Sequence, residues 1–389
     1  MNRLPAMDQK LIKWMADIRR HLHRQPELSG EEHQTCRYVR AKLEELGLNS
    51  RRVHKTGVLA AVGEKGGSED GVALRADLDA LPIGEETGLA FASRVPGVMH
   101  ACGHDGHVAM LLGAAALLQR CGPLPGRVGL IFQPAEEGDG GAAGMITAGA
   151  LDGVKAIFAG HIDRHLPTGE IGVQAGAICA STDEFEIVVR GRGGHAAKPH
   201  ETKDSIVIAA ALTINLQTLV ARNCDPVQPA VLTIGRIRGG TAANVIAEET
   251  RLTGTIRAIS PRTRQILLSG LQRMVKAAGL AHGAKISLAV SEGCPPLHND
   301  PAATALARRV AERVLGPARV PGLAAPSLGG EDFAFYLQKI PGCMVRFGAE
   351  KKGGANGPAH SSRFDFDEKV LPIGAAFLAQ TALAALEEL

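Results

Sequence analysis

The sequence is poor in aromatic residues, which make up 3% of its 389 positions and include one Trp and two Tyr. This scarcity argues against a surface that binds nucleic acid by stacking bases on aromatic rings. An excess of one charge is also lacking, because 43 Lys and Arg stand against 40 Asp and Glu, a formal net charge of +3. So small an excess argues against a basic surface for nucleic acid or for an anionic membrane.

Long apolar runs and a disulfide framework are missing as well. We find no uninterrupted apolar stretch of the roughly 18 residues that a membrane span requires. Charges interrupt the amino-terminal segment 1–28 every few residues, so we expect no signal peptide there. The seven cysteines are odd in number and scattered, which does not suggest disulfide pairing. These features predict a soluble protein of the reducing cytoplasm.

The length of 389 residues exceeds what one hydrophobic core usually serves, which favours two domains. In the first part of the chain, helical and strand patterns alternate, and this order is typical of a mainly parallel α/β sheet. Helical periodicity is found at 8–24, 31–48 and 105–120, and strand patterns at 58–63, 71–77, 126–132 and 154–160. We expect Asp105 to be the N-cap of the third helix.

The pattern changes near residue 180 to the order βαββαβ, which is the ferredoxin-like split motif. The expected elements are a strand at 183–191, a helix at 203–222, strands at 229–237 and 250–259, a helix at 261–280 and a strand at 284–290. We therefore predict an α/β catalytic domain of residues 1–182 and 296–389, interrupted by an inserted domain of residues 183–295.

Several side chains that bind metals follow the predicted strands of the first domain. Ligands of open α/β sheets bind at the carboxyl ends of the strands, so these positions favour a common site. The side chains so placed are Arg75, Asp77 and Asp79 after one strand, Glu136 and Glu137 after the next and His161 after a third, with Cys102 and His104 directly before a helix. Thiolate, imidazole and carboxylate groups together are typical of zinc, and mixed sites also accept manganese, cobalt or nickel.

Each of these residues has an ordinary structural interpretation when taken alone. Adjacent glutamates such as Glu136 and Glu137 are usually a solvated surface pair, and Cys102 alone is more often a small buried apolar residue. Asp77 can form a turn, and His161 can be a hydrogen-bonded core histidine. The recurrence of ligand types at strand ends nevertheless favours a metal site. Neighbouring side chains on an extended segment point apart, so one glutamate can ligate a metal while the other faces water.

Six motifs, taken together, make the sequence similar to the M20 family of metallopeptidases and amidohydrolases. They are ALRADLDALPI (73–83), MHACGHDGH (99–107), FQPAEEG (132–138), GRGGHAAKPHETKD (191–204), GGEDFAFY (329–336) and HSSRFDFDE (360–368). Within the family they resemble the branch of hippurate hydrolases, N-acyl-amino-acid amidohydrolases and auxin-conjugate hydrolases. The motifs occur in order over nearly the whole chain.

The resemblance implies a centre of two divalent metal ions per subunit, zinc or manganese, with cobalt or nickel as alternatives. It makes Cys102 the bridging ligand, and it completes the ligand set with His104, Glu137, His161 and His360. It makes Glu136 the general base and proton shuttle, and Asp77 the residue that orients a ligand histidine.

For the inserted domain the resemblance implies a lid that also dimerises, which gives a homodimer or a dimer of dimers. His195 would reach the site of a neighbouring protomer and stabilise the oxyanion. Asn244 and Arg257 would contact the substrate, since an arginine fork suits a free carboxylate. Two ordinary interpretations stay open: Arg257 as a surface cation and Asn244 as a turn former. The segments NVIA (244–247), HSSRF (360–364) and HIDRHLP (161–167) depart from the usual family pattern.

The sequence therefore predicts a metal-dependent enzyme that hydrolyses the amide bond of small N-acyl amino acids, such as N-benzoyl or N-acetyl derivatives, and binds neither nucleic acid nor a membrane. A dipeptidase or carboxypeptidase of the same fold is the nearest alternative. A non-catalytic protein that binds metal or amino acids is less favoured, because a pure binding site needs ligands but no base such as Glu136. A structural zinc protein is disfavoured, because its ligands would be Cys and His at short spacing.

Overall fold

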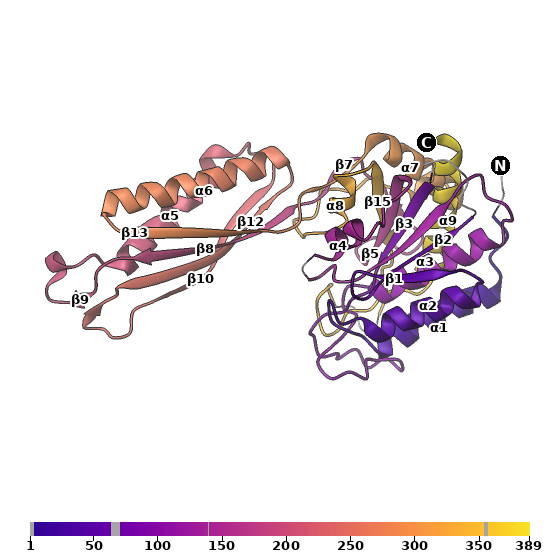
Figure 1. The fold of residues 1–389 in the computed structure, drawn as a ribbon, viewed down its shortest axis with the longest axis horizontal. Helices are drawn as coiled ribbons and strands as arrows, with labels where there is room; N and C mark the ends of the chain where they lie inside the picture. Colours follow the sequence, from indigo (N-terminus) through magenta and orange to yellow (C-terminus); the bar gives the residue numbers. More distant parts are fainter. Residues whose placement is uncertain (1–3, 64–70, 139, 354–356) are drawn as a thin grey trace. The chain divides into compact units, whose positions relative to one another are not determined.

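A computed structural model describes residues 4–63, 71–138, 140–353 and 357–389 and divides into two compact units (Figure 1). The first unit contains Met1–Gly176, His298–Ala324 and Phe335–Leu389, and the second contains Ala177–Leu297 and Ala325–Ala334. The second unit thus begins before residue 183, and it includes a segment, 325–334, that the sequence analysis assigned to the catalytic domain.

A seven-stranded mixed sheet forms the centre of the first unit, in the order β1-β2-β4-β3-β5-β15-β6. Its strands are β1 (Ser50–Val53), β2 (Gly57–Val62), β3 (Gly71–Asp77), β4 (Val128–Gln133), β5 (Val154–Asp163), β6 (Ile171–Gly172) and β15 (Gly342–Gly348). The four central strands, β4, β3, β5 and β15, are parallel, whereas β1, β2 and β6 join antiparallel at the margins. The parallel strands therefore bring their carboxyl ends to one edge, where the candidate side chains follow.

Two largely apolar helices, α3 (His104–Gln119) and α9 (Val370–Glu388), pack together and against the central strands of this sheet (Figure 1). Glycines permit the close approach of these two helices, since a Cβ on Gly113 would lie 2.9 Å from Ala375 Cβ and one on Gly374 would lie 2.0 Å from Met110 Sδ. Apart from the two helices of the second unit, the described residues also form α1 (Gln9–Arg24), α2 (His33–Glu45), α4 (Gly141–Thr147), α7 (Pro301–Leu315) and the short α8 (Ala334–Leu337).

An antiparallel four-stranded sheet forms the second unit, in the order β10-β12-β8-β13, with two helices on one side (Figure 1). Its elements are β8 (Ser181–Arg190), α5 (Ser205–Asn223), β10 (Ala230–Gly239), β12 (Glu249–Ala258), α6 (Pro261–His282) and β13 (Lys285–Glu292). This order is the predicted βαββαβ motif. Asp204 caps α5 and Ser260 caps α6 through side-chain oxygens, as the residue types at these positions favour.

Smaller elements complete the chain. The strands β9 (Gly194–His195) and β11 (Val245–Ile246) pair with each other, as do β7 (Gly176–Cys179) and β14 (Leu297–Asn299). Short 3-10 turns lie at Pro199–Glu201 and Pro317–Arg319.

One predicted cap is wrong. The N-cap of α3 is Gly103, at φ +92°, and Asp105 lies within the first turn. Its Oδ2 pairs with His23 and Arg19, because a buried charge needs compensation, and its Oδ1 accepts the N–H of Gly106.

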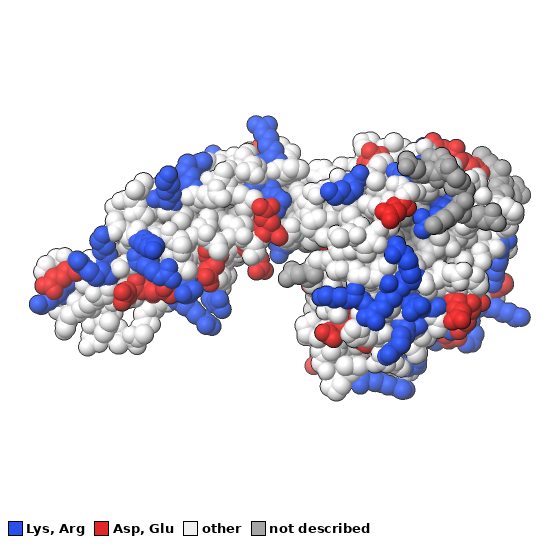
Figure 2. Space-filling model, viewed as in Figure 1, with Lys and Arg blue, Asp and Glu red and all other residues white. Residues whose placement is uncertain are grey.

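Within the part of the chain that the structure describes, two helices, α5 and α9, are long and apolar enough to cross a membrane by length and composition alone. α9 is mostly buried in the core of the first unit, and α5 packs one face against α6 and the sheet of the second. Figure 2 shows basic and acidic side chains on both units, in keeping with the near balance of charge in the sequence.

Arg19 of α1 connects segments that lie far apart in the sequence. Its guanidinium is 1% exposed and pairs with Asp365 at 2.6 Å, Glu368 at 2.9 Å and Asp105 at 3.3 Å. The group also stacks over the ring of Phe366, 3.9 Å from the ring centre. Since Asp105 follows the candidate ligand His104, Arg19 anchors the start of α3 to the segment that follows His360.

His23 completes this buried network. Its Nδ1 lies 2.8 Å from Asp105 and its Nε2 lies 3.3 Å from Glu85. Burial would lower the pKa of His23, but the hydrogen bonds to the two carboxylates outweigh it and raise the pKa to about 9. His23 is therefore a cation in the folded protein at neutral pH.

The raised pKa of His23 predicts a pH-dependent stability. Its contribution is complete below the unfolded value of 6.5 and is lost as the pH rises through about 9. We expect this group to remove on the order of 3 kcal/mol of unfolding free energy across that window. Urea unfolding at pH 6, 7.5 and 9 measures it, and a His23→Gln variant should flatten the decline. An equal decline in the variant would contradict this assignment.

Candidate metal centre

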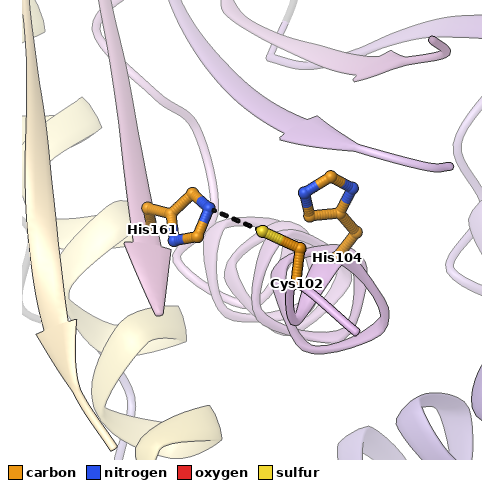
Figure 3. A group of neighbouring side chains, drawn as sticks. All are labelled: Cys102, His104 and His161. Atoms are coloured by element: carbon orange, nitrogen blue, oxygen red, sulfur yellow. Dashed lines mark hydrogen bonds between the residues drawn. The ribbon is translucent and has the colours of Figure 1, made fainter. Parts of the chain in front are cut away.

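Cys102, His104 and His161 converge from two elements of the first unit (Figure 3). Cys102 lies in the loop before α3, His104 is the first residue of α3, and His161 lies near the end of β5. Cys102 Sγ is 3.5 Å from His161 Nε2. The other ring nitrogen of His161 lies 2.8 Å from the carbonyl oxygen of Ile162, so it carries the proton and Nε2 is free to ligate a metal.

A second group shares the same thiol and comprises Cys102, Glu137 and His360. His360 Nε2 lies 2.9 Å from Glu137 Oε1. The backbone N–H of His360 donates to the carbonyl of Ala101, which brings this distant residue beside Cys102. Within each group the ligand atoms lie within 4.8 Å of one another, so Cys102 is the common member of two three-donor clusters.

His104 is oriented by Asp79. Its Nδ1 lies 3.0 Å from the carbonyl oxygen of Asp79 and 3.2 Å from the carboxylate Oδ1. Among the described residues, Nε2 has no hydrogen-bond partner, and oxygens of Asp77 and Glu136 lie 3.8 and 4.0 Å from it. A buried ring nitrogen without a hydrogen-bond partner, fixed by a carboxylate on the other side, fits a metal ligand.

Asp77 contacts a different histidine. Its Oδ1 accepts from His107 Nδ1 at 2.6 Å, while Oδ2 accepts from Arg75 at 2.7 Å. His107 Nε2 in turn accepts the backbone N–H of Ile162, the residue after His161. The contact of Asp79 with His104 was not predicted from the sequence, although the motif ALRADLDALPI contains both aspartates two residues apart.

The site's electrostatics favour a cation. Burial would lower the pKa of His104, but Asp77, Asp79 and Cys102 raise it well above the ordinary value. Hydrogen bonds to Cys102 and Glu137 raise the pKa of His360 to about 10. Burial, His107 and Arg346 lower the pKa of His161 well below its ordinary value. Anionic groups that bind protons so strongly also attract metal ions, and metal binding then releases the protons.

The segment that carries Glu136 and Glu137 follows β4 and contains a left-handed residue. Ala135 has φ +52°, which costs a residue with a Cβ roughly 1–2 kcal/mol. The N–H of Glu137 donates to Asp79 Oδ2 at 2.9 Å, so the carboxylate that orients His104 also fixes this loop. Glu136 is 9% exposed and belongs to a cluster with His104 and Glu137, which places it beside both donor groups.

The other candidate residues belong to the second unit. His195 and Asn244 lie on neighbouring segments, since His195 pairs with Val245 and Ala196 donates its N–H to the carbonyl of Asn244. Arg257 lies near the other end of β12, opposite Thr182 of β8. The strand from Glu249 to Arg257 alone spans about 26 Å. One protomer therefore cannot bring Asn244 and Arg257 to the same small substrate within this unit.

Comparisons with known proteins found related sequences. The sequence model described as peptidase family M20/M25/M40 matches residues 73–384. N-acetyl-L-cysteine deacetylase of Bacillus subtilis is 41% identical, over 98% of this chain and 91% of its own. Thermostable carboxypeptidase 1 of Saccharolobus solfataricus is also 41% identical, over 97% and 96%.

A solved structure shows the same fold. It is a Bacillus subtilis protein described as a dinuclear metal-binding peptidase of the M20 family, and it is 37% identical. The comparison covers 98% of this chain and all of the other, with a TM-score of 0.85.

The contacts of Asp79 predict a change in metal affinity. Asp79→Ala removes the carboxylate partner of His104 Nδ1, leaving the backbone carbonyl, and it removes the acceptor of the Glu137 N–H, so we expect metal affinity to fall about 10- to 100-fold. Metal content after dialysis against graded chelator measures the change. Asp204→Ala, which removes a cap of α5 in the second unit, is the control and should leave affinity unchanged. Unchanged affinity in Asp79→Ala would show that Asp79 does not support the ligands.

Proposed function

The chain belongs to peptidase family M20/M25/M40, and from that premise we propose that it hydrolyses the amide bond of N-acyl amino acids at a dinuclear metal centre. The products are a carboxylic acid and a free amino acid. The observation that carries this proposal is the sharing of Cys102 by two donor groups, with Glu136 beside them. A thiolate common to both groups suits a bridging ligand, and His104, Glu137, His161 and His360 supply the other donors.

Zinc or manganese bound there would polarise the amide carbonyl and lower the pKa of a bound water to about 7. Glu136 is not needed as a ligand, and its carboxylate takes the proton of the attacking water and transfers it to the leaving nitrogen. Asp79 and Asp77 hold the imidazoles of His104 and His107 in fixed tautomers.

His195 suits the role of oxyanion donor. Its Nδ1 accepts the N–H of Ala197 at 3.1 Å, so the neutral ring carries its proton on the exposed Nε2. We propose that this N–H serves the site of a second protomer. His195 and Asn244 lie far from Arg257 in the same unit, which supports the assignment of these residues to two different sites. Arg257 would hold a substrate carboxylate in one site, and His195 and Asn244 would act across the dimer.

Peptidase activity is the main alternative. The deacetylase and the carboxypeptidase have the same sequence identity to this chain, 41%, so identity does not distinguish N-acyl amino acids from peptides as substrates. A protein that binds metal without catalysis is disfavoured, because Glu136 lies 4.0 Å from His104 Nε2 and is present in addition to the five proposed donors. All seven cysteines are free, which supports the proposed cytoplasmic location.

Homodimerisation through the second unit is supported by an exposed apolar stripe. Val207 and Ile214 of α5 are 60% and 71% exposed and lie seven residues apart, on one face of the helix. The neighbouring β10 is an edge strand, with Ile237 half exposed. Exposed edges and apolar stripes of this kind are usually covered in the assembled protein.

A Glu136→Gln variant tests the mechanism. We expect kcat to fall about 10²- to 10⁴-fold while metal content stays the same, because the amide keeps the shape but cannot accept a proton. Amino-acid release is measured with metal-stripped protein reloaded with Mn, Zn, Co or Ni, on hippurate, N-acetyl amino acids, indoleacetyl conjugates and dipeptides. Cleavage of dipeptides alone would favour the peptidase alternative, and no release with any metal would favour a binding protein.

A charged substitution tests the dimer. Val207→Glu combined with Ile214→Glu should convert the dimer to a monomer in light scattering, because two carboxylates would be buried in the interface. Leu280→Glu on α6, which replaces a residue that is 77% exposed, is the matched control and should leave the dimer intact. Dimers that persist in the double variant would place the interface elsewhere.

A further inference from the structure

A fully buried carboxylate, Glu32, contacts the segment after β4 that carries Glu136 and Glu137, here called the glutamate loop. It stands between α1 and α2, and its side chain is excluded from solvent. Its Oε1 accepts the backbone N–H groups of Gly30 and Ala135, each at 2.8 Å. Its Oε2 accepts the hydroxyl of Thr56 at 2.5 Å. Ala135 is 103 residues away in the sequence, so this carboxylate joins two distant segments.

Capping of α2 does not explain these contacts. Glu32 occupies the N-cap position, but among the described residues its side chain makes no capping hydrogen bond to the helix. Glu27 performs that task, since its carboxylate accepts the N–H groups of Gln34 and Thr35. Burial raises the pKa of Glu32 even though these donors lower it, so its placement opposes the ordinary preference of a carboxylate for water.

The contact with Ala135 has a geometric consequence for the next residue. Ala135 is left-handed without being glycine, a conformation that neighbouring structure must hold. The N–H before Glu136 is bound by Glu32, and the N–H after it, that of Glu137, is bound by Asp79. Asp79 is also tied to the segment of Glu32, because it accepts the hydroxyl of Ser29 at 2.6 Å. The backbone on both sides of Glu136 is therefore fixed by hydrogen bonds from the N–H groups of Ala135 and Glu137.

We propose that Glu32 is a positioning residue for the reaction, which sets the direction of the Glu136 carboxylate by holding Ala135 in its left-handed conformation. The proposal rests on the role proposed above for Glu136 as general base. Glu32 acts through the backbone and touches neither substrate nor metal. Removing it frees Ala135 to relax, and a general base that moves by about 1 Å loses up to about 100-fold in rate. Glu137 remains anchored by Asp79, so metal binding is retained.

The test compares Glu32→Ala with Glu27→Ala, a matched control that removes a carboxylate from the same segment without touching the glutamate loop. We expect Glu32→Ala to lower kcat about 10- to 100-fold, with KM and metal content within about two-fold of the wild type. Hydrogen exchange in a peptide spanning 129–138 should become faster. Glu27→Ala should change none of these quantities. Loss of metal, an equal loss of kcat in the control, or wild-type kcat in Glu32→Ala would each overturn the proposal.

Two further variants decide the matter if Glu32→Ala does not fold. Glu32→Gln keeps the length, and because both backbone donors share Oε1, its amide oxygen can still accept them. Glu32→Asp keeps the charge but is one methylene too short to reach Ala135 and Thr56 together. We expect Gln to retain kcat and Asp to lose it, and the reverse ranking would overturn the proposal.

The result separates the two proposals. If Glu136→Gln is inactive and Glu32→Ala is fully active, Glu32 is not a positioning residue and the proposed function stands. If the wild-type protein releases no amino acid with any metal, the proposed function fails. Hydrogen exchange in 129–138 then still decides whether Glu32 holds the loop.

Discussion

Compensation of buried charge at the carboxyl ends of the parallel strands is the constraint on which the first unit depends. The sheet delivers Asp77 and Asp79 to one edge, where desolvation alone would raise the pKa of both carboxyl groups. Each of the two aspartates is instead held as an anion by partners that the fold supplies: His104 and Ser29 for Asp79, and Arg75 with two histidines for Asp77. The fold itself thus holds these two carboxylates in place beside the candidate metal ligands.

The order of elements was predictable wherever a periodic pattern faced a single core. The βαββαβ order followed from such patterns, whereas β15 and α9 were missed. β15 is a short apolar run among glycines, and α9 is apolar on almost all sides, with Pro372 in its first turn, so neither shows a clear period. Burial on every side removes the contrast between faces that sequence analysis uses.

The sequence allowed the candidate metal ligands to be predicted, but not the residues that orient them. Cys102 and His161 were predicted as donors because they are ligand-type residues beside predicted elements, and the family motifs added His360. Which aspartate orients which histidine could not be predicted, because Asp77 and Asp79 are two residues apart, His104 and His107 are three apart, and either pairing is compatible with the spacing. Contacts such as that between Glu32 and Ala135 depend on how distant loops meet, and no local pattern encodes them.

The buried guanidinium of Arg19 also imposes an order on synthesis. Its partners Asp365 and Glu368 are 346 and 349 residues further along the chain, so α1 leaves the ribosome long before they exist. The second unit is built mostly from one continuous stretch and can fold while the first still waits for its last segment. The nascent chain therefore exposes an incomplete core, in which Arg19 can reach Asp105 but lacks two of its three carboxylate partners until the last segment has been made.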